Sequence, residues 1–188
     1  MNLEQISEDY EGVAREIFGP LRSSVEDVAT AMVTCVRQGG KVMFCGNGGS
    51  AADAQHFAGE FVNRFLKERP AFAGLALTTD TSVMTAVGND YSFDEIFQKQ
   101  VEGLGREGDV LVSLTTSGNS VNIVRAVEAA KQKGLINVVL TGGTGGRVAA
   151  LADHNLCISS TPSTPRIQEG HHLIMHLLCE TVEEQLTT

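Results

Sequence analysis

The chain has 188 residues, of which 42% are hydrophobic and 20% are charged, a balance typical of one globular domain with a buried core. Its formal net charge of -9 at pH 7 argues against a surface for duplex nucleic acid, which needs clustered Lys and Arg. Only 5% of the residues are aromatic and none is Trp, so stacking platforms for bases are not expected. These properties favour a small-molecule ligand over nucleic acid.

The sequence also lacks the signals of membrane insertion and secretion. No stretch approaches the roughly 20 apolar residues of a membrane span, and the segment 2–16 is too acidic for a signal peptide. The four cysteines show no C-x-x-C spacing, which argues against a zinc ribbon or a redox motif: Cys35, Cys45, Cys157 and Cys179. We therefore expect a cytoplasmic protein with free thiols and no membrane partner.

Two helical segments open the chain, at 3–18 and 21–38. Gly19-Pro20 separates them, because a proline disfavours the helical conformation of the residue before it. Gly39-Gly40 ends the second segment. A last helix is predicted at about 166–185.

Five short, almost continuously apolar runs follow, as expected of strands buried on both faces: 41–45, 74–78, 109–114, 136–141 and 155–159. Helical periodicity fills the gaps, most clearly after Ser50 and after Ser120. This alternation predicts an α/β fold with a five-stranded parallel sheet flanked by helices. We treat 1–188 as one domain, with 1–38 as a helical extension and 39–188 as the sheet core and last helix. The surplus of helices predicts helix packing between subunits.

The turn 115–120, Thr-Thr-Ser-Gly-Asn-Ser, stands between a predicted strand and a predicted helix. A helix N-terminus attracts anions, and the turn adds four hydroxyls from Thr115, Thr116, Ser117 and Ser120. We interpret it as a site for a phosphate monoester. The alternative is a hydroxyl-rich helix cap without a ligand.

Two other glycine-rich turns follow strands. The turn 45–50 contains a G-x-G-x-x-A pattern, but the acidic residue of a dinucleotide site, expected about 20 positions further on, is missing. Asn47 and Ser50 are better suited to sugar hydroxyls or a phosphate. The turn 141–146 lacks the Lys of a Walker loop and is interpreted as a plain strand-to-helix turn.

Two helices carry candidate metal ligands or acid–base groups. His56 and Glu60 are spaced i, i+4, so they share a helix face, although a solvated His–Glu pair has the same spacing. Gln168, His172 and His176 form a similar row near the end of the chain. These donors suit a divalent metal such as zinc, and Glu60 with a histidine also suits general acid–base catalysis. On spacing alone, His172 is as good a ligand as its neighbours.

The motifs occur in an order that resembles a known family: CGNGGSAADAQHFAGE at 45–60, VGND at 87–90, GREGDVL at 105–111, TTSGNS at 115–120, and RIQE at 166–169 followed by His176. The chain resembles the phosphoheptose isomerases, which are built on a sugar isomerase (SIS) domain. The resemblance implies a three-layer, flavodoxin-like fold, a homotetramer with sites at subunit interfaces, and one zinc per subunit. It also implies conversion of D-sedoheptulose 7-phosphate into D-glycero-D-manno-heptose 7-phosphate for lipopolysaccharide or another surface glycan.

The resemblance also assigns roles to individual residues. It implies that the phosphate is held by Ser50, Thr116, Ser117 and Ser120. The sugar chain is implied to lie against Asn47, Gly48, Gly49, Asn89, Asp90, Thr115 and Gln168. The implied zinc positions are His56, Glu60, Gln168 and His176, and Glu60 and His176 also match the proposed base and acid.

Two departures from the family pattern are visible. Thr115 replaces a frequent Ser and keeps the hydroxyl, whereas Pro165 stands where some members carry Asp, so that carboxylate is lost. One rival is a non-catalytic SIS protein that binds a replication initiator; such a relative lacks the Glu and the last-helix His that this chain keeps as Glu60 and His176. Another rival is an isomerase or sensor of a different ketose phosphate.

Overall fold

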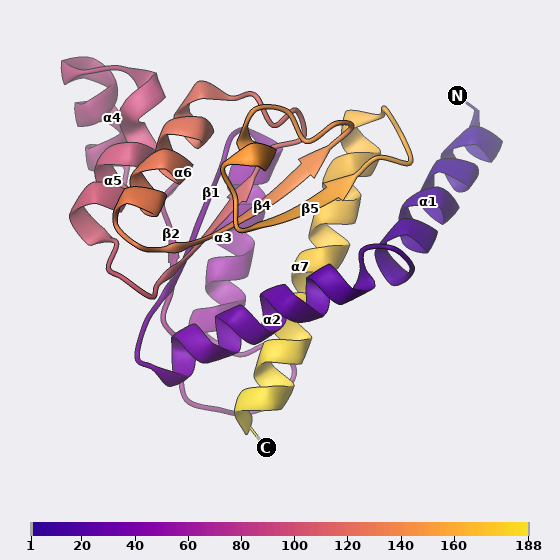
Figure 1. Ribbon diagram of the computed structural model, residues 1–188, viewed down its shortest axis with the longest axis horizontal. Coiled ribbons are helices and arrows are strands. Elements are labelled where there is room, and N and C mark those ends of the chain that lie inside the picture. Colours follow the sequence, from indigo (N-terminus) through magenta and orange to yellow (C-terminus); the bar gives the residue numbers. More distant parts are fainter. Residues whose placement is uncertain (1, 188) are drawn as a thin grey trace.

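The computed structural model describes residues 2–187, and its centre is a five-stranded parallel sheet (Figure 1). The strands are β1 (Val42–Gly46), β2 (Gly74–Ala76), β3 (Val110–Leu114), β4 (Ile136–Gly142) and β5 (His154–Ile158). All neighbours pair in parallel in the order β2-β1-β3-β4-β5. This is the flavodoxin-like strand order, so the predicted fold class is confirmed.

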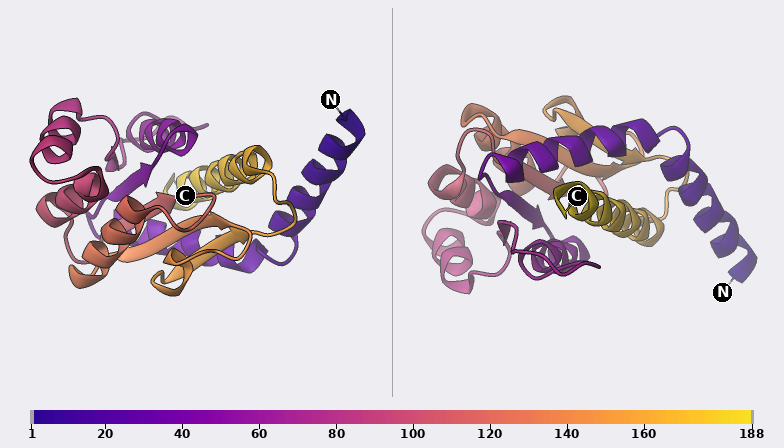
Figure 2. Two further views of the ribbon diagram at one scale, coloured as in Figure 1. Left: turned by 90° about the horizontal axis from the view of Figure 1, so that it is seen from above. Right: turned by 90° about the horizontal axis from the view of Figure 1, so that it is seen from below.

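Helices cover both faces of the sheet. They are α1 (Leu3–Phe18), α2 (Arg22–Arg37), α3 (Gly49–Val62), α4 (Thr81–Asp90), α5 (Ile96–Leu104), α6 (Val121–Gln132) and α7 (Thr164–Thr187), with short 3-10 turns η1 (Phe93–Glu95) and η2 (Val148–Ala150). Residues of α1, α2, α3 and α7 share one apolar core with the sheet, and residues of α5 and α6 share the other. Helix α1 extends from the end of the molecule opposite α4 (Figure 2).

The strands are apolar throughout because alternate side chains enter different cores. Phe44, Val112 and Leu140 face the α2, α3 and α7 side, whereas their chain neighbours Met43 and Leu111 face α5 and α6. All these side chains are fully buried. Burial on both faces is the physical reason for the near-continuous apolar runs in the sequence.

Most predicted boundaries fall within two residues of the observed ones. The last helix is longer at both ends than the predicted 166–185, and Pro165 lies in its first turn, where its missing N–H costs no helical hydrogen bond. Strand β2 ends at Ala76 rather than at residue 78, although Leu77 still donates its backbone N–H to Phe44. None of the helices described is long and apolar enough to cross a membrane. All four cysteines are free, and only Cys157 is not fully buried.

The sheet order brings two of the predicted turns together. Strands β1 and β3 are neighbours in the sheet, and the chain leaves β1 toward β2 on one side and β3 toward β4 on the other. Ligands of open α/β sheets bind at the carboxyl ends of strands where the order reverses in this way. The turns after β1 and β3 therefore meet at the expected ligand position.

A buried carboxylate fastens α7 to the loop after α3. Glu183 accepts hydrogen bonds from the backbone N–H groups of Phe65, Leu66 and Lys67 at 2.7–2.9 Å, and from Arg69 Nε at 2.9 Å. Both charged side chains are only 2% exposed. Burial acts to raise the pKa of Glu183, but these hydrogen bonds outweigh it and the pKa is lowered.

Arg69 also connects this buried carboxylate to α3. Its guanidinium donates to the carbonyl oxygens of Glu60 at 2.7 Å and Phe61 at 3.0 Å, in the last turn of that helix. The Glu183–Arg69 clamp thus fixes the end of α3 relative to α7.

Substituting Glu183→Gln should destabilise the fold by about 3–5 kcal/mol, because Arg69 stays buried without its counter-charge. The stabilisation by Glu183 is present above the ordinary carboxyl pKa of 4.5 and is lost as the pH falls through the lowered native value. The difference in unfolding free energy between the wild type and Glu183→Gln should therefore become smaller as the pH falls. Urea unfolding at pH 7 and at stepwise lower pH measures it, with the exposed Glu180→Gln on the same helix as control. Equal stability of wild type and Glu183→Gln at pH 7 would refute the clamp.

Candidate functional site

The hydroxyl-rich turn forms a small hollow at the carboxyl ends of β1 and β3. The hollow has a volume of about 80 Å³ and is lined by Asn47, Ser50, Leu114, Thr115, Thr116, Ser117 and Ser120. Six of these seven residues are sequence-predicted phosphate or sugar residues. The hydroxyl of Ser120 does not cap α6, although Ser120 occupies the N-cap position. The hydroxyl is therefore available to a ligand at a helix N-terminus that favours anions.

The third glycine-rich turn supports this hollow from behind. Gly118 has a positive φ of 65°, and a Cβ added to it would lie 2.0 Å from the carbonyl oxygen of Gly145. Val148 N donates to the Gly118 carbonyl, and Arg147 N donates to the Asn119 side chain. The turn after β4, interpreted from the sequence as a plain connection, leads into η2 and packs against the hydroxyl turn.

A pair of amides joins the two ligand turns. Asn47 and Asn122 exchange two hydrogen bonds, at 2.9 and 2.8 Å, and Asn122 is 3% exposed in the first turn of α6. The sequence interpretation did not single out Asn122. Its only sequence signal is an amide at a position of α6 that lies among apolar residues.

Three histidines gather between α3 and α7. The ligand nitrogens of His56, His172 and His176 all lie within 4.8 Å of one another, and the Nε2 atoms of His56 and His176 are 3.1 Å apart. Phe57 lies beneath the cluster, and the Phe65 ring stacks on His176. Burial first, then the neighbouring His172 and His56, lower the pKa of His176, which favours its neutral, metal-binding form.

Glu60 lies at the edge of this cluster. Its Oε1 is 3.4 Å from His56 Nε2, one helical turn away, and its side chain is 24% exposed. The structure thus places three of the four predicted metal positions, His56, Glu60 and His176, close together.

Gln168, the fourth predicted metal position, lies instead against the N-terminal turns of α3. Its Nε2 donates to Asp53 Oδ2 at 2.9 Å. A Cβ added to Gly49 would lie 2.5 Å from the same Nε2, so a larger residue at position 49 would displace the Gln168 amide from this position. Asp53 also meets His172, with 3.1 Å between Oδ1 and Nδ1. Asp53 is 7% exposed and was missed by the sequence interpretation, although it lies one turn before His56 and Phe57 on the same helix face.

The remaining predicted residues lie apart from these groups. Asn89 and Asp90 end α4, are exposed, and hydrogen-bond each other at 2.8 Å. His171, the neighbour of His172, is instead a core residue. It is fully buried against the Thr141 carbonyl, and burial lowers its pKa to about 4.

The histidine cluster fits a divalent metal. Imidazole nitrogens suit zinc, and two nitrogens bound about 2.0–2.1 Å from a tetrahedral zinc lie roughly 3.3 Å apart. The His56–His176 separation of 3.1 Å is close to that value. The rings have partly exposed edges through which a substrate oxygen could reach the metal.

Comparisons with known proteins place the chain in a family. The SIS domain model matches residues 8–142. A phosphoheptose isomerase from Nitratidesulfovibrio vulgaris (strain Miyazaki F) is 54% identical over 162 residues, covering 86% of this chain and 77% of the relative. One from Rhodospirillum rubrum is 53% identical, covering 89% of both chains. The solved phosphoheptose isomerase from Neisseria gonorrhoeae superimposes with a TM-score of 0.89 at 43% identity, covering 97% of this chain and 96% of that one.

The fold and the matched residues define an SIS domain protein. Within that group, the chain belongs to the phosphoheptose isomerase family.

Substituting Asn122→Ala should destabilise the protein by about 1–3 kcal/mol, because the Asn47 amide loses both hydrogen bonds in a partly buried place. Chemical denaturation measures this change. Gln132→Ala, at the exposed end of the same helix, is the matched control and should leave stability unchanged. Identical stability of Asn122→Ala and wild type would mean that the amide pair does not hold the two turns together.

Proposed function

We propose that this protein is an aldose–ketose isomerase that converts D-sedoheptulose 7-phosphate into D-glycero-D-manno-heptose 7-phosphate. The observation that carries the proposal is a hydroxyl-lined anion hollow beside the start of α3, together with a carboxylate–histidine cluster further along the same helix. The family relationship favours the heptose substrate over other ketose phosphates.

The phosphate would bind in the hollow. Ser50, Thr116, Ser117 and Ser120 donate hydroxyl hydrogen bonds to it at the N-terminus of α6. The sugar chain then extends along Asn47, Gly48, Gly49 and Thr115 toward Gln168. Asn89 and Asp90, exposed in the single chain, would bind sugar hydroxyls.

The reaction moves a carbonyl from C2 to C1 through an enediol. Glu60 removes a proton from C1 while the C2 oxygen gains one, which gives the enediol. A proton then returns to C2 as the C1 hydroxyl loses its own, and the aldose carbonyl forms. We assign the carbon-bound proton to Glu60 and the oxygen-bound protons to His176, whose lowered pKa leaves a neutral ring able to accept one.

The metal is proposed to be zinc, one per subunit, held by His56 and His176, with Glu60 and Gln168 as the further ligands that the resemblance implies. When bound, a divalent cation supplies positive charge to the substrate's oxygens.

We further propose that the protein is cytoplasmic and forms a homotetramer. Its product would be used to make lipopolysaccharide or another surface glycan. Large apolar side chains on α1 support subunit packing, since Leu3, Tyr10 and Phe18 are 67%, 48% and 57% exposed. The rival, a non-catalytic protein that binds a replication initiator, is not favoured, because Glu60 and His176 are both present and adjoin His56.

The purified protein should form aldoheptose 7-phosphate from sedoheptulose 7-phosphate, and Glu60→Gln should lower kcat by about 10²–10⁴-fold because the base is lost. Substrate binding by that variant should persist. Coupled assay and calorimetry separate the two effects. The control, Glu68→Gln, alters an exposed carboxylate in the loop after α3. No product from the wild type with any divalent metal would move the binding-protein function to first place, and a fully active Glu60→Gln would remove Glu60 as the base.

Substituting Ser120→Ala should raise KM for the phosphorylated sugar about tenfold or more, because a hydrogen bond to a charged group is lost. Fold stability should not change, since this hydroxyl caps no helix. Steady-state kinetics and thermal unfolding measure the two quantities. Ser23→Ala, on the exposed face of α2, is the control. An unchanged KM would place the phosphate outside the hollow.

A further inference from the structure

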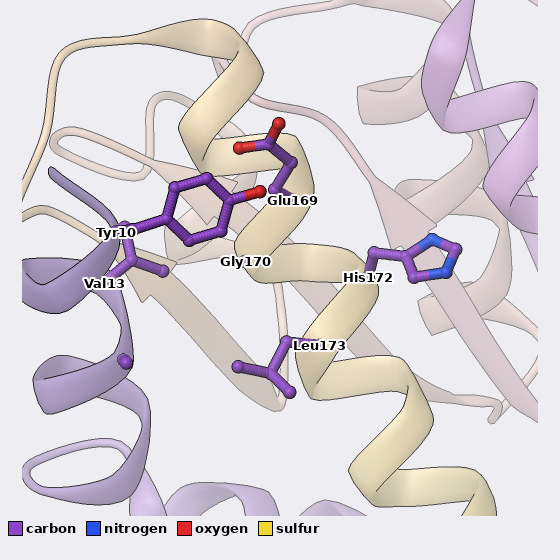
Figure 3. A pocket seen from close by; sticks show the side chains of 7 residues that line it. Tyr10, Val13, Glu169, Gly170, His172 and Leu173 are labelled. Atoms are coloured by element: carbon purple, nitrogen blue, oxygen red, sulfur yellow. The ribbon is translucent and has the colours of Figure 1, made fainter. Parts of the chain in front are cut away.

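Helix α7 carries a row of polar residues on the side that faces α3. His172, His176 and Glu183 are separated by four and seven residues, which places them on one face of the helix. Figure 3 shows the His172 imidazole directed away from the hollow that Tyr10 and Leu173 line between α1 and α7. The proposed acid, His176, and the buried Glu183 therefore lie on the same side of α7, two helical turns apart.

Arg69 closes the C-terminal end of α3, the helix that carries the proposed base. The last carbonyl groups of a helix have no partner within it, and a cation at that end is favourable. Arg69 Nη2 donates to the Glu60 carbonyl oxygen at 2.7 Å, and Nη1 donates to that of Phe61 at 3.0 Å. The Arg69 side chain is 2% exposed, and its guanidinium carbon lies 3.7 Å from the centroid of the Phe72 ring. A buried group thus holds the backbone of Glu60.

Glu183, the partner of Arg69, is linked to the other member of the acid–base pair. It accepts the backbone N–H of Phe65 at 2.9 Å, and the Phe65 ring stacks on the His176 ring with 5.4 Å between centroids and 28° between planes. Glu183 also accepts Arg69 Nε at 2.9 Å. One buried ion pair is therefore connected to the backbone of Glu60 and to the ring packed against His176.

The stability of the fold does not by itself require an ion pair here. Replacing a buried ion pair by well-packed apolar residues is often neutral or stabilising. The rate of a proton transfer depends much more steeply on position, since a displacement of about 1 Å can cost 10²-fold. A buried pair with fixed hydrogen bonds on both members therefore suits a site in which two groups must keep their relative placement.

We propose that the Glu183–Arg69 clamp positions the acid–base pair for catalysis. Arg69 fixes the backbone of Glu60, and Glu183 fixes Phe65 against His176. Both residues act through others, so they are positioning residues and not catalytic residues. The inference rests on the proposed function and extends it to two residues that the sequence interpretation did not single out.

Substituting Arg69→Lys tests the first half of the proposal. Lysine keeps the charge beside Glu183 but lacks the planar fork that reaches a carboxylate and two carbonyl groups at once. With zinc and substrate saturating, kcat per folded molecule should fall about tenfold or more. KM should stay at the wild-type value, because the hydroxyl-lined hollow lies at the other end of α3. Circular dichroism of the same samples gives the folded fraction, which corrects kcat for misfolded protein.

Substituting Phe65→Leu tests the second half. The variant keeps the backbone N–H that Glu183 accepts but loses the ring that stacks on His176. Its kcat per folded molecule should also fall, again with KM unchanged. A wild-type kcat in this variant would show that the contact between Phe65 and His176 has no part in catalysis.

Two controls separate positioning from stability. Arg37→Lys alters a guanidinium that donates to the Gln185 carbonyl oxygen of α7 at 2.8 Å, more than two helical turns beyond His176. Asp109→Asn removes a buried carboxylate that pairs with Lys41 immediately before β1 and β3, at the opposite ends of these strands from the hydroxyl turn. Both variants should keep the wild-type kcat per folded molecule, although Asp109→Asn should lower stability.

Hydrogen exchange provides a measure that does not depend on activity. The backbone amides of residues 59–63 should exchange faster in Arg69→Lys than in Arg37→Lys, because the last turn of α3 loses the group that holds it. Equal exchange in the two variants would mean that Arg69 does not fix the backbone of Glu60.

This inference and the proposed function fail in different ways. If the wild type forms aldoheptose 7-phosphate and Arg69→Lys has the same kcat per folded molecule, the clamp serves stability alone and the inference is overturned, while the proposed reaction stands. If the wild type forms no product, the proposed reaction is refuted and the inference, which rests on it, fails with it.

Discussion

The site depends on how two helices, α3 and α7, are held against each other. Two buried carboxylates do this from opposite ends of the contact. Asp53 on α3 receives Gln168 and His172 from α7, and Glu183 on α7 receives Arg69 and three backbone N–H groups from the loop after α3. Between these two connections lie His56, Glu60 and His176. Because a buried carboxylate is costly unless fully hydrogen-bonded, each connection strongly favours a single helix arrangement.

The sheet provides the second half of the site. Strands β1 and β3 are adjacent, so the turns that follow them share one edge, and the Asn47–Asn122 pair joins those turns directly. Helix α3 begins at Gly49, immediately after the first turn, and carries His56 and Glu60 two and three helical turns further on. The hydroxyl-lined turn and the histidine cluster are thus separated by two to three turns of α3.

The sequence predicted the sheet well because its signal is local. Buried parallel strands must be apolar on both faces. The hydroxyl turn was also visible in the sequence, because its hydroxyls lie within a few residues of one another. Helix α4 gave a weak signal because none of its residues is buried in the single chain. Asp53 and Asn122 were missed for a different reason. Their partners Gln168 and Asn47 are 115 and 75 residues away in the chain, so only the folded arrangement shows that these polar groups are satisfied.

The same reasoning separates the tasks of the two acidic residues of α3. Asp53 is almost fully buried, makes hydrogen bonds with two side chains of α7, and cannot move without leaving both unpaired. Glu60 is 24% exposed, and its carboxylate lies 3.4 Å from His56 Nε2, while Arg69 holds its backbone carbonyl. A group that moves a proton between adjacent carbons needs a fixed backbone and a side chain free to shift by a bond length. Of these two carboxylates, only Glu60 has that combination.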